Sequence, residues 1–296
     1  MSIMSFPERG PWGQSSWRGN CSGYVYQDLF QRLCPQVFID PMVGSGTSVE
    51  VDKEMKIEAY GLDLHSGFNA LKDSILHVVG KPADLCLSHP PYGPMVKYSG
   101  KGGMWGDKPH PDDLSHCLDD EDFHAKLQLV LMNQREATLP GGFYGTIIGD
   151  LRQNGRYVSY QAEAIARMPA DELAAVIIKA QHNVQSGGKS YGKMALPFIL
   201  HEYILLWKRK DMSLFGVLKS VAIQAQARLT GTWKNVVRQC LIQCGGKADL
   251  DSLYKTVAKS TDRIETNPHW KDKVRQVLNQ NPELFKPVQR GIWAIA

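Results

Sequence analysis

A histidine and a tyrosine bracket two prolines at the end of a short apolar segment. The segment runs from Asp84 to Tyr92 and reads Asp-Leu-Cys-Leu-Ser-His-Pro-Pro-Tyr. Prolines cannot continue a strand ladder, so the chain must leave the sheet edge rigidly, with His89 and Tyr92 presented around the turn. A neutral imidazole accepts one hydrogen bond through its unprotonated nitrogen. The pattern is typical of a rigid catalytic loop, although such turns also occur in ordinary connections.

A glycine turn lies upstream of this segment. Residues 37–51 read Val-Phe-Ile-Asp-Pro-Met-Val-Gly-Ser-Gly-Thr-Ser-Val-Glu-Val. They predict a buried strand ending at Asp40, a tight turn from Gly44 to Gly46 and a helix opening at Thr47, as at the start of a parallel α/β sheet. Glycines let the backbone approach a ligand, and free amides at a helix start attract negative groups, so a nucleotide-like ligand is expected. No lysine follows as in a Walker A loop, and the GxGxxG spacing is absent.

Two further acidic positions follow the glycine turn. Asp63 ends the segment Tyr60-Gly-Leu-Asp, which predicts the next strand. A carboxylate at this position is well placed to accept hydrogen bonds from ribose hydroxyls. Residues 70–73, Ala-Leu-Lys-Asp, predict a third acidic loop that ends at Asp73.

The elements that must position these residues alternate between strands and helices. We expect a loop until about Gly23, a helix to Leu33, a mobile loop over 99–116 and a polar loop over 150–156. Further helices are predicted at 119–139 and 157–168, and further strands at 84–88, 143–148, 174–179 and 201–208. The opening residues of the last strand, 201–203, are expected to be structural. This alternation favours an α/β fold with one doubly wound, mostly parallel, seven-stranded, Rossmann-like sheet over residues 1–212.

Composition indicates a soluble globular protein. The 296 residues are 43% hydrophobic and 22% charged. No apolar run approaches the length of a membrane span and the N-terminus lacks the blocks of a signal peptide, so a cytoplasmic protein without a membrane partner is expected. The six cysteines show no CxxC spacing, which favours reduced thiols over a metal site or a disulfide framework.

The last part of the chain is basic. Residues 213–296 contain 13 Lys and Arg against 6 Asp and Glu, a balance of +7, so residues 1–212 carry 4 minus 7, or −3. Helices are predicted at 233–243, 250–258 and 270–279, and a hairpin around Gln289-Arg-Gly. Three helices closed by a hairpin resemble a small winged helix-turn-helix domain, here residues 213–296. Its expected phosphate contacts are Lys271, Lys273, Arg275 and Arg290.

A second basic stretch precedes the last strand. Residues 181–193 are polar and contain Lys189 and Lys193, which suits a loop facing DNA. A plain connection is the alternative, and a small docking domain with a solvated basic face is the alternative for the C-terminal domain.

Together, the glycine turn and the Pro-Pro-Tyr loop resemble the amino-group nucleic-acid methyltransferases, which form N6-methyladenine or N4-methylcytosine in DNA. The resemblance covers residues 9–210, and Asp40 to Thr47 is similar to the first motif of that family. It implies S-adenosylmethionine as cofactor, S-adenosylhomocysteine as product and no metal. The partner would be DNA, either a duplex with a flipped base or a single strand.

The resemblance also implies roles for individual residues. Asp63 would bind the cofactor ribose, and Asp73 its adenine. The segment Trp17-Arg-Gly-Asn-Cys-Ser is similar to an extra cofactor motif of the family and would contribute Asn20 and Ser22. The methionine part would be held by the glycine turn, through Asp40, Pro41, Gly44, Gly46 and Thr47.

In the family, the first side chain of the catalytic motif and the following proline carbonyl accept hydrogen bonds from the target amino group, and the final aromatic stacks on the base. The resemblance therefore implies a catalytic segment made of His89, Pro90, Pro91 and Tyr92. The family usually has Asp, Asn or Ser where this chain has His89. Because a protonated imidazole cannot accept a hydrogen bond, we expect activity to be lost at mildly acidic pH.

We expect adenine N6 as the target, because serine at the first position is the commoner cytosine pattern. Three alternatives stay open: a cytosine N4 methyltransferase, a protein glutamine N5 methyltransferase, and a DNA-binding protein that has lost catalysis. RNA is a further candidate substrate. Neither the target sequence nor the oligomeric state follows from these patterns.

Overall fold

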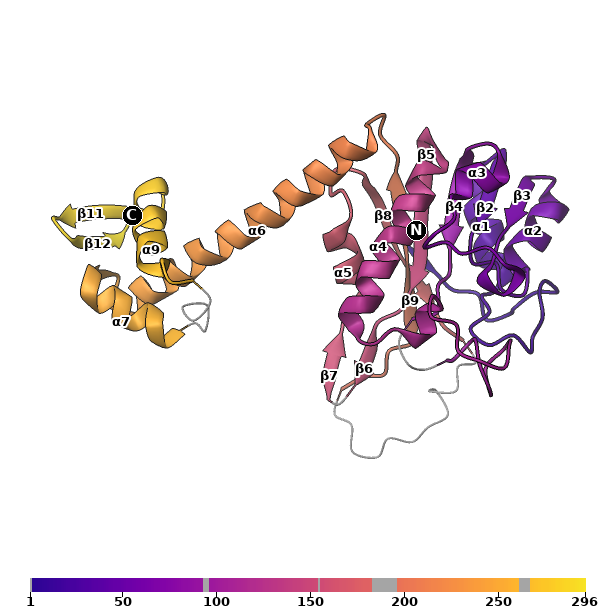
Figure 1. Ribbon diagram of the computed structural model, residues 1–296, viewed down its shortest axis with the longest axis horizontal. Coiled ribbons are helices and arrows are strands. Elements are labelled where there is room, and N and C mark those ends of the chain that lie inside the picture. Colours follow the sequence, from indigo (N-terminus) through magenta and orange to yellow (C-terminus); the bar gives the residue numbers. More distant parts are fainter. Residues whose placement is uncertain (1, 93–95, 154, 183–195, 261–266) are drawn as a thin grey trace. The chain divides into compact units, whose positions relative to one another are not determined.

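The computed structural model describes residues 2–92, 96–153, 155–182, 196–260 and 267–296 (Figure 1). The chain forms two compact units, Met1–Val217 and Leu218–Ala296. The boundary falls inside helix α6 (Leu214–Gln243), shortly after the division at residue 212 expected from the charge pattern. Among the helices described, none is long and apolar enough to cross a membrane.

A seven-stranded sheet forms the centre of the first unit (Figure 1). The strands lie in the order β1-β8-β9-β5-β4-β2-β3. Only β9 (His201–Lys208) runs antiparallel to its neighbours in this sheet. The other strands are β1 (Ile3–Met4), β2 (Val37–Asp40), β3 (Glu58–Gly61), β4 (Ala83–Ser88), β5 (Thr138–Ile148) and β8 (Leu173–Ala180). The mostly parallel, Rossmann-like sheet predicted from the sequence is confirmed.

Helices pack around this sheet in two groups. Helix α1 packs against α2, while α4 packs against α3, α5 and strands β4 and β5. The apolar stripe of α1 explains its placement, since Val25, Leu29 and Phe30 are each 1% exposed and share a core with Phe38 and Leu85. The elements are α1 (Gly23–Leu33), α2 (Thr47–Met55), α3 (Ile75–Val79), α4 (Asp120–Glu136), α5 (Tyr160–Arg167) and the 3₁₀ turns η1 (Leu64–Ser66) and η2 (Leu114–His116).

Strand β5 begins earlier than expected. The sequence predicts a helix to residue 139 and a strand from 143, but α4 ends at Glu136 and β5 starts at Thr138. Thr138 pairs with Ala83 and Phe143 with Leu85, so the intervening Pro-Gly-Gly segment bulges within the strand. Gly141 has φ 85°, a conformation that glycine adopts readily.

Two other loop predictions are wrong. Ile3 and Met4 form β1, which pairs in parallel with Ile178 and Lys179 at the sheet edge. Two residues are too few to show a strand periodicity in sequence. The expected polar loop at 150–156 contains most of an antiparallel pair, β6 (Leu151–Gln153) and β7 (Arg156–Val158).

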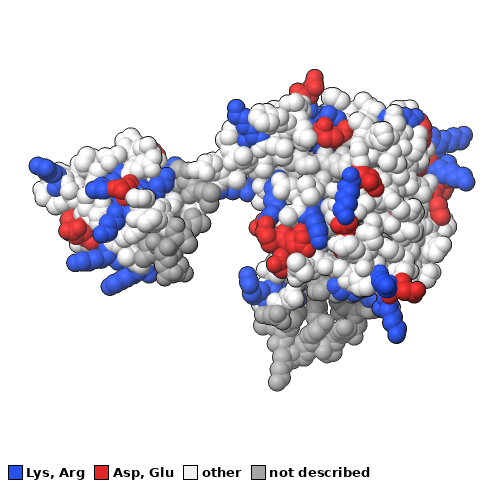
Figure 2. Space-filling view, viewed as in Figure 1, with Lys and Arg blue, Asp and Glu red and all other residues white. Residues whose placement is uncertain are grey.

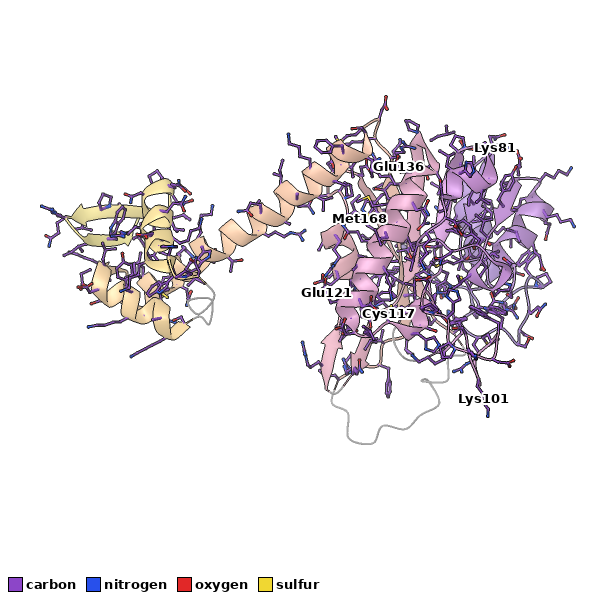
Figure 3. All side chains as sticks on the ribbon, in the orientation of Figure 1. Lys81, Lys101, Cys117, Glu121, Glu136 and Met168 are labelled. Atoms are coloured by element: carbon purple, nitrogen blue, oxygen red, sulfur yellow. The ribbon has the colours of Figure 1, made fainter. Side chains whose placement is uncertain are left out.

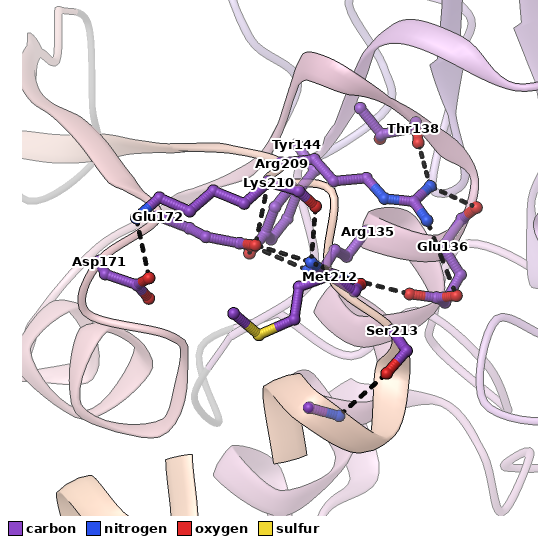
Figure 4. Close-up of polar contacts among 11 residues, drawn as sticks. Arg135, Glu136, Thr138, Tyr144, Asp171, Glu172, Arg209, Lys210, Met212 and Ser213 are labelled. Carbon is purple, nitrogen blue, oxygen red and sulfur yellow. Dashed lines mark hydrogen bonds and ion pairs between the residues drawn. The ribbon is translucent and has the colours of Figure 1, made fainter. Parts of the chain in front are cut away.

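A buried ion pair holds the chain that leaves β9 (Figure 4). The guanidinium of Arg135 is fully buried and donates to both carboxylate oxygens of Glu172 at 2.7 and 2.9 Å. Tyr144 donates its hydroxyl to the same carboxylate at 2.6 Å. Arg135 also donates to the backbone carbonyls of Lys210 and Met212 at 3.1 and 3.3 Å, which fixes the connection into α6.

The second unit combines helices with a small sheet. Its helices are the later part of α6, α7 (Leu250–Ser260) and α9 (Trp270–Gln280). Its antiparallel sheet has the order β10 (Lys247–Asp249), β12 (Ile292–Ile295), β11 (Phe285–Gln289). Val237, Leu253, Val274 and Phe285 are at most 1% exposed and form part of its core. The sequence predicts α7, α9, the hairpin and the end of α6 from residue 233, but neither β10 nor the part of α6 before residue 233.

Candidate active site

A cleft opens where β2, β3 and β4 end. It encloses about 850 Å³ of space free of protein atoms, part of it open to solvent. Eight of the predicted site residues line it: Asn20, Asp40, Pro41, Gly44, Thr47, Asp63, His89 and Pro91. The structure therefore brings the glycine turn and part of the His-Pro-Pro-Tyr segment to one site.

The glycine turn is shaped by backbone geometry and by a close contact. Gly44 has φ 52°, and a Cβ there would lie 2.8 Å from Nε1 of Trp17. Its amide donates to Oδ2 of Asp63 at 2.9 Å, which joins the turn to the end of β3. Gly46, with φ 88°, is the N-cap of α2. A side chain at Gly44 would displace the indole that lines the cleft.

An N-terminal segment closes over this turn through the side chain of Asn20. Its amide nitrogen donates to Oγ of Ser45 at 2.7 Å, and its oxygen accepts from Oγ1 of Thr47 at 2.5 Å. Trp17 lies beside His65 and Tyr98, with ring centroids 5.3 and 6.3 Å away. Trp17, Asn20 and Cys21 all line the cleft.

Two carboxylates of the cleft are held in place by hydrogen bonds. Asp40 is 2% exposed and accepts from the amide of Met42 at 2.9 Å and from Oγ of Ser48 at 2.7 Å. Burial raises the pKa of Asp40 to about 6, against the lowering effect of these two bonds. Asp63 lies 2.7 Å from Nδ1 of His65, and this hydrogen bond raises the pKa of His65.

Five of the predicted catalytic and cofactor-binding residues lie outside the cleft lining: Ser22, Gly46, Asp73, Pro90 and Tyr92. The Ser22 hydroxyl donates to the carbonyl of Glu8 at 2.7 Å. Asp73 accepts from the amide of Asn69 at 2.8 Å and so closes its own loop. Residues 69–71 of this loop line the cleft in place of Asp73.

The glycine-rich loop at 99–116 contributes residues that the sequence patterns did not single out. Trp105, Asp112, Asp113 and Leu114 line the cleft. Asp113 holds the loop by accepting from the amide and hydroxyl of Ser99 at 2.8 and 2.6 Å. Lys101 is exposed on this loop (Figure 3). A segment rich in glycine and proline predicts a loop, but it does not reveal which residues of that loop line the cleft.

Glu202 binds both ends of the His-Pro-Pro-Tyr segment. His89, whose side chain is 13% exposed, places Nε2 3.3 Å from Oε1 of Glu202. The Tyr92 hydroxyl donates to the same oxygen, and Nζ of Lys179 donates to Oε2. Glu202 and Lys179 are 3% and 8% exposed. Burial acts to raise the pKa of Glu202, but the charge of Lys179 and the contacts with His89 outweigh it and hold this pKa well below its usual range.

The sequence predicts only a structural role for residues 201–203, but Glu202 also contacts the predicted catalytic segment. The sequence does contain a pattern that points to this residue. Lys179 and Glu202 are opposite charges in two largely apolar strands, β8 and β9, and they pair directly in the sheet register. Such a pattern indicates a buried ion pair, since an isolated buried charge is costly.

The predicted nucleic-acid contacts lie in different parts of the chain. Lys189 and Lys193 are outside the described residues. Lys271, Lys273 and Arg275 are on α9, and Arg290 is in the turn between β11 and β12. Figure 2 shows Lys and Arg side chains gathered on the second unit. Nζ of Lys271 lies 5.5 Å above the ring of Tyr254, and Arg275 is paired with Asp272.

Within the described ranges, no group of three or more His, Cys, Asp and Glu side chains is arranged to hold a metal ion. No protein-family model and no curated protein matches the sequence.

Solved structures give weak likenesses. TrmN from Thermus thermophilus is 15% identical with a TM-score of 0.41, covering 65% of this chain and 50% of TrmN. A proposed DNA modification methylase from the same organism, complexed with S-adenosyl-L-methionine, is 21% identical with a TM-score of 0.31, covering 49% and 54% of the two chains. The Thermus thermophilus 16S rRNA N2 G1207 methyltransferase, in complex with AdoMet and guanosine, is 13% identical with a TM-score of 0.34, covering 67% and 45%.

The chain thus spans about half the length of these structures.

Proposed function

We propose that the first unit is an S-adenosylmethionine-dependent methyltransferase that methylates the exocyclic amino group of a nucleic-acid base, with adenine N6 in DNA as the favoured target. One observation carries this proposal. Gly44 and His89 belong to separate motifs, yet both line a single cleft beside Asp63. A ligand bound against the glycine turn would therefore face the first residue of the His-Pro-Pro-Tyr segment.

The charge of the cleft fits this cofactor. Four carboxylates line it, from Asp40, Asp63, Asp112 and Asp113, and no Lys or Arg appears among the described residues that do so. Such a lining suits a ligand with a sulfonium and an ammonium group and disfavours one with a phosphate. When bound, S-adenosylmethionine supplies an electrophilic methyl group. Aromatic rings of the lining, including Trp17, Phe68 and Tyr98, offer surfaces for its adenine and its cation.

We assign the cofactor contacts from this arrangement. Asp63 would accept hydrogen bonds from the ribose hydroxyls, since it follows the strand next to the glycine turn. Asn20, Gly44 and Thr47 would surround the methionine part. Residues 69–71, rather than Asp73, would border the adenine.

The target amino group would meet acceptors at the end of β4. An exocyclic amine is a poor nucleophile, so the site must orient it and accept its hydrogens rather than supply a strong base. We assign these roles to the His89 imidazole and the Pro90 carbonyl. Tyr92, which is half-buried, would stack on the flipped base.

For the second unit we propose a winged-helix-like role in holding DNA. Three helices with a three-stranded antiparallel sheet support it, as does the basic balance of residues 213–296. Lys271, Lys273 and Arg275 on α9 and Arg290 at the hairpin turn would contact phosphates. In this proposal catalysis belongs to the first unit and DNA retention to the second.

Mass spectrometry of nucleosides tests the proposal. The full chain is incubated with methyl-labelled S-adenosylmethionine and, in separate reactions, duplex DNA, single-stranded DNA and RNA. Label in N6-methyl-2′-deoxyadenosine from DNA is the expected result. Label in N4-methylcytosine or only in RNA would change the assigned base or polymer. No labelled nucleoside, together with measurable cofactor binding, would reject methyl transfer to nucleic acid.

Two glycine variants provide the matched controls. Gly44→Ala forces a left-handed φ on alanine and drives its Cβ toward Trp17, so cofactor binding and labelling should both fail. Gly67 has φ 98°, and a Cβ there meets nothing within 4 Å, so Gly67→Ala carries the backbone strain alone. Equal losses in both variants would contradict a ligand site at the glycine turn.

A further inference from the structure

We call residues His89 to Tyr92 the acceptor segment, after the role assigned to them above. The carboxylate of Glu202 contacts both ends of this segment from the other side of strand β5. Glu202 lies on β9, opposite Lys179 of β8, whereas His89 and Tyr92 leave the end of β4. Strand β5 separates β4 from β9. It ends at Ile148, which pairs with Tyr203, and the next residue, Gly149, has no side chain to block the contact. The hydroxyl of Tyr92 therefore passes Gly149 to reach Glu202.

The hydrogen-bonding chemistry fixes which nitrogen of His89 carries its proton. An ionised carboxylate only accepts hydrogen bonds, so Nε2 of His89 must be the donor in the contact at 3.3 Å. The neutral imidazole then has its lone pair on Nδ1. Within the described residues, no hydrogen bond to Nδ1 of His89 is found, and His89 lines the cleft. Lys179 balances the charge of Glu202, so the buried carboxylate that orients the imidazole has its own counter-charge.

We propose that Glu202 is a positioning residue that holds His89 as the Nε2–H tautomer, with Lys179 as its counter-charge, so that Nδ1 is free to accept the target amino group. This inference rests on the proposed function and extends it to residues that do not themselves touch the substrate. Tyr92 is held by the same carboxylate, so both ends of the acceptor segment share one anchor.

The proton balance of the transfer is consistent with this tautomer. The target nitrogen forms a bond to the methyl carbon, the methyl–sulfur bond breaks with its electron pair left on sulfur, and the nitrogen must lose one proton. Nδ1 of His89 accepts that proton. The imidazolium that results is stabilised through its Nε2–H by Glu202, and it returns the proton to solvent after product release.

The decisive variant is Glu202→Gln, because Lys179 dictates how the new amide would sit. The ammonium of Lys179 can only donate hydrogen bonds, so it binds the oxygen of the new amide. The amide NH₂ then faces His89 and Tyr92. Nε2 of His89 must then accept, and the ring shifts to the Nδ1–H tautomer. We expect methyl transfer to fall roughly a thousandfold, by comparison with carboxylate-to-amide changes behind a catalytic histidine. Affinity for S-adenosylhomocysteine should stay within about twofold of wild type.

Nitrogen NMR of histidine-labelled protein reads the tautomer directly, without any substrate. The His89 signals are identified by their loss in His89→Gln. We expect wild-type His89 to be protonated at Nε2 and Glu202→Gln to be protonated at Nδ1. The double variant Glu202→Gln/Lys179→Met frees the amide to turn, so the wild-type tautomer and at least part of the rate should return. Glu163→Gln, the same substitution on the surface of α5, should change neither readout.

A wild-type His89 protonated at Nδ1, or a tautomer unchanged in Glu202→Gln, would overturn the inference. The wild-type spectrum alone decides the first point, even if the variants fold poorly. A wild type that shows the expected tautomer but methylates no DNA or RNA would instead refute the proposed function while upholding the assignment to Glu202.

Discussion

Gly149 lies against the ring of Tyr92. A Cβ at residue 149 would come within 2.7 Å of the tyrosine hydroxyl and 2.9 Å of two ring carbons. Real side chains essentially never approach so closely, so any side chain at this position must push Tyr92 away from Glu202. The end of β5 thus sets the position of the last residue of the acceptor segment.

Gly149→Ala should therefore lower methyl transfer by about a hundredfold, the usual cost of misplacing an active-site group by about 1 Å. Cofactor affinity, measured by calorimetry with S-adenosylhomocysteine, should be unchanged because Tyr92 does not line the cleft. Gly155→Ala is the control, since a Cβ there meets nothing within 4 Å. Full activity in Gly149→Ala would show that the position of Tyr92 is unimportant.

Asn20→Ala should weaken cofactor binding. The substitution removes the hydrogen bonds to Ser45 and Thr47 that close the N-terminal segment over the glycine turn. Two bonds of about 1 kcal/mol each correspond to a rise in Kd of roughly tenfold or more. Calorimetry with S-adenosylhomocysteine measures it. Gln31→Ala, at an exposed position of α1, should leave the Kd unchanged; an equal effect of both variants would point to general destabilisation.

Asp52 makes stability depend on pH. Its side chain is 0% exposed, and neither carboxylate oxygen has a hydrogen-bond partner in the part of the chain described. Burial, followed by the charge of Asp40, raises the pKa of Asp52 to about 8. The folded chain therefore binds a proton that the unfolded chain releases above about pH 4, so the free energy of unfolding falls as pH rises from about 4 to about 8.

Asp52→Asn removes this dependence. Thermal denaturation at about pH 8 should show a midpoint raised by at least about 3 °C, which corresponds to about 1 kcal/mol for a domain of this size. Near pH 4 the two proteins should differ little. Asp28→Asn removes a carboxylate that is paired with Arg32 and should give no such gain. A midpoint difference that does not grow with pH would argue against a protonated Asp52.

Glu172→Gln should destabilise the first unit strongly. The fully buried guanidinium of Arg135 would lose its charged partner, and breaking a buried pair in this way costs about 3–5 kcal/mol. The neighbouring Asp171→Asn removes only a half-exposed ion pair with Lys210, so it should cost less than about 1 kcal/mol. Urea denaturation followed by tryptophan fluorescence measures both. Similar losses would mean that burial of the Arg135 pair does not matter.

Charge reversal on α9 should weaken DNA binding without affecting the cofactor. If Lys273 contacts a phosphate, Lys273→Glu lowers affinity for all sequences alike and reduces the slope of log affinity against log salt by about 1. Fluorescence anisotropy of labelled duplexes over a salt series gives the slope. Lys81→Glu, on the first unit beside Glu58, is the control. An unchanged slope in Lys273→Glu would remove this residue from the interface.

The sequence patterns were most informative where local chemistry decides the structure. The glycine turn, the strand before His89 and the helices of the second unit were all predictable, because backbone freedom, proline and apolar periodicity act over a few residues. Gly44 and His89 could be assigned to one site because parallel strands end at the same sheet edge.

The structural features that the sequence patterns did not predict depend on contacts between residues far apart in the sequence. Strand β1 exists only because Ile3 meets Ile178, and no local pattern reveals that partner. The role of Glu202 depends on a register across β8 and β9 and on the missing side chain of Gly149. Pro140-Gly-Gly predicts a loop between a helix and a strand, because a bulge within a strand uses the same residues as a loop.

The pairing of β1 with β8 also bears on when parts of the first unit can form during protein synthesis. Ile3 leaves the ribosome 175 residues before Ile178 (178 − 3), and Lys179 and Glu202 follow only then. A nascent chain that already contains the glycine turn and the His-Pro-Pro-Tyr segment still lacks the carboxylate that holds the latter. The cofactor half of the cleft can therefore form during translation, whereas the acceptor half gains its anchor only once β9 has emerged and joined the sheet.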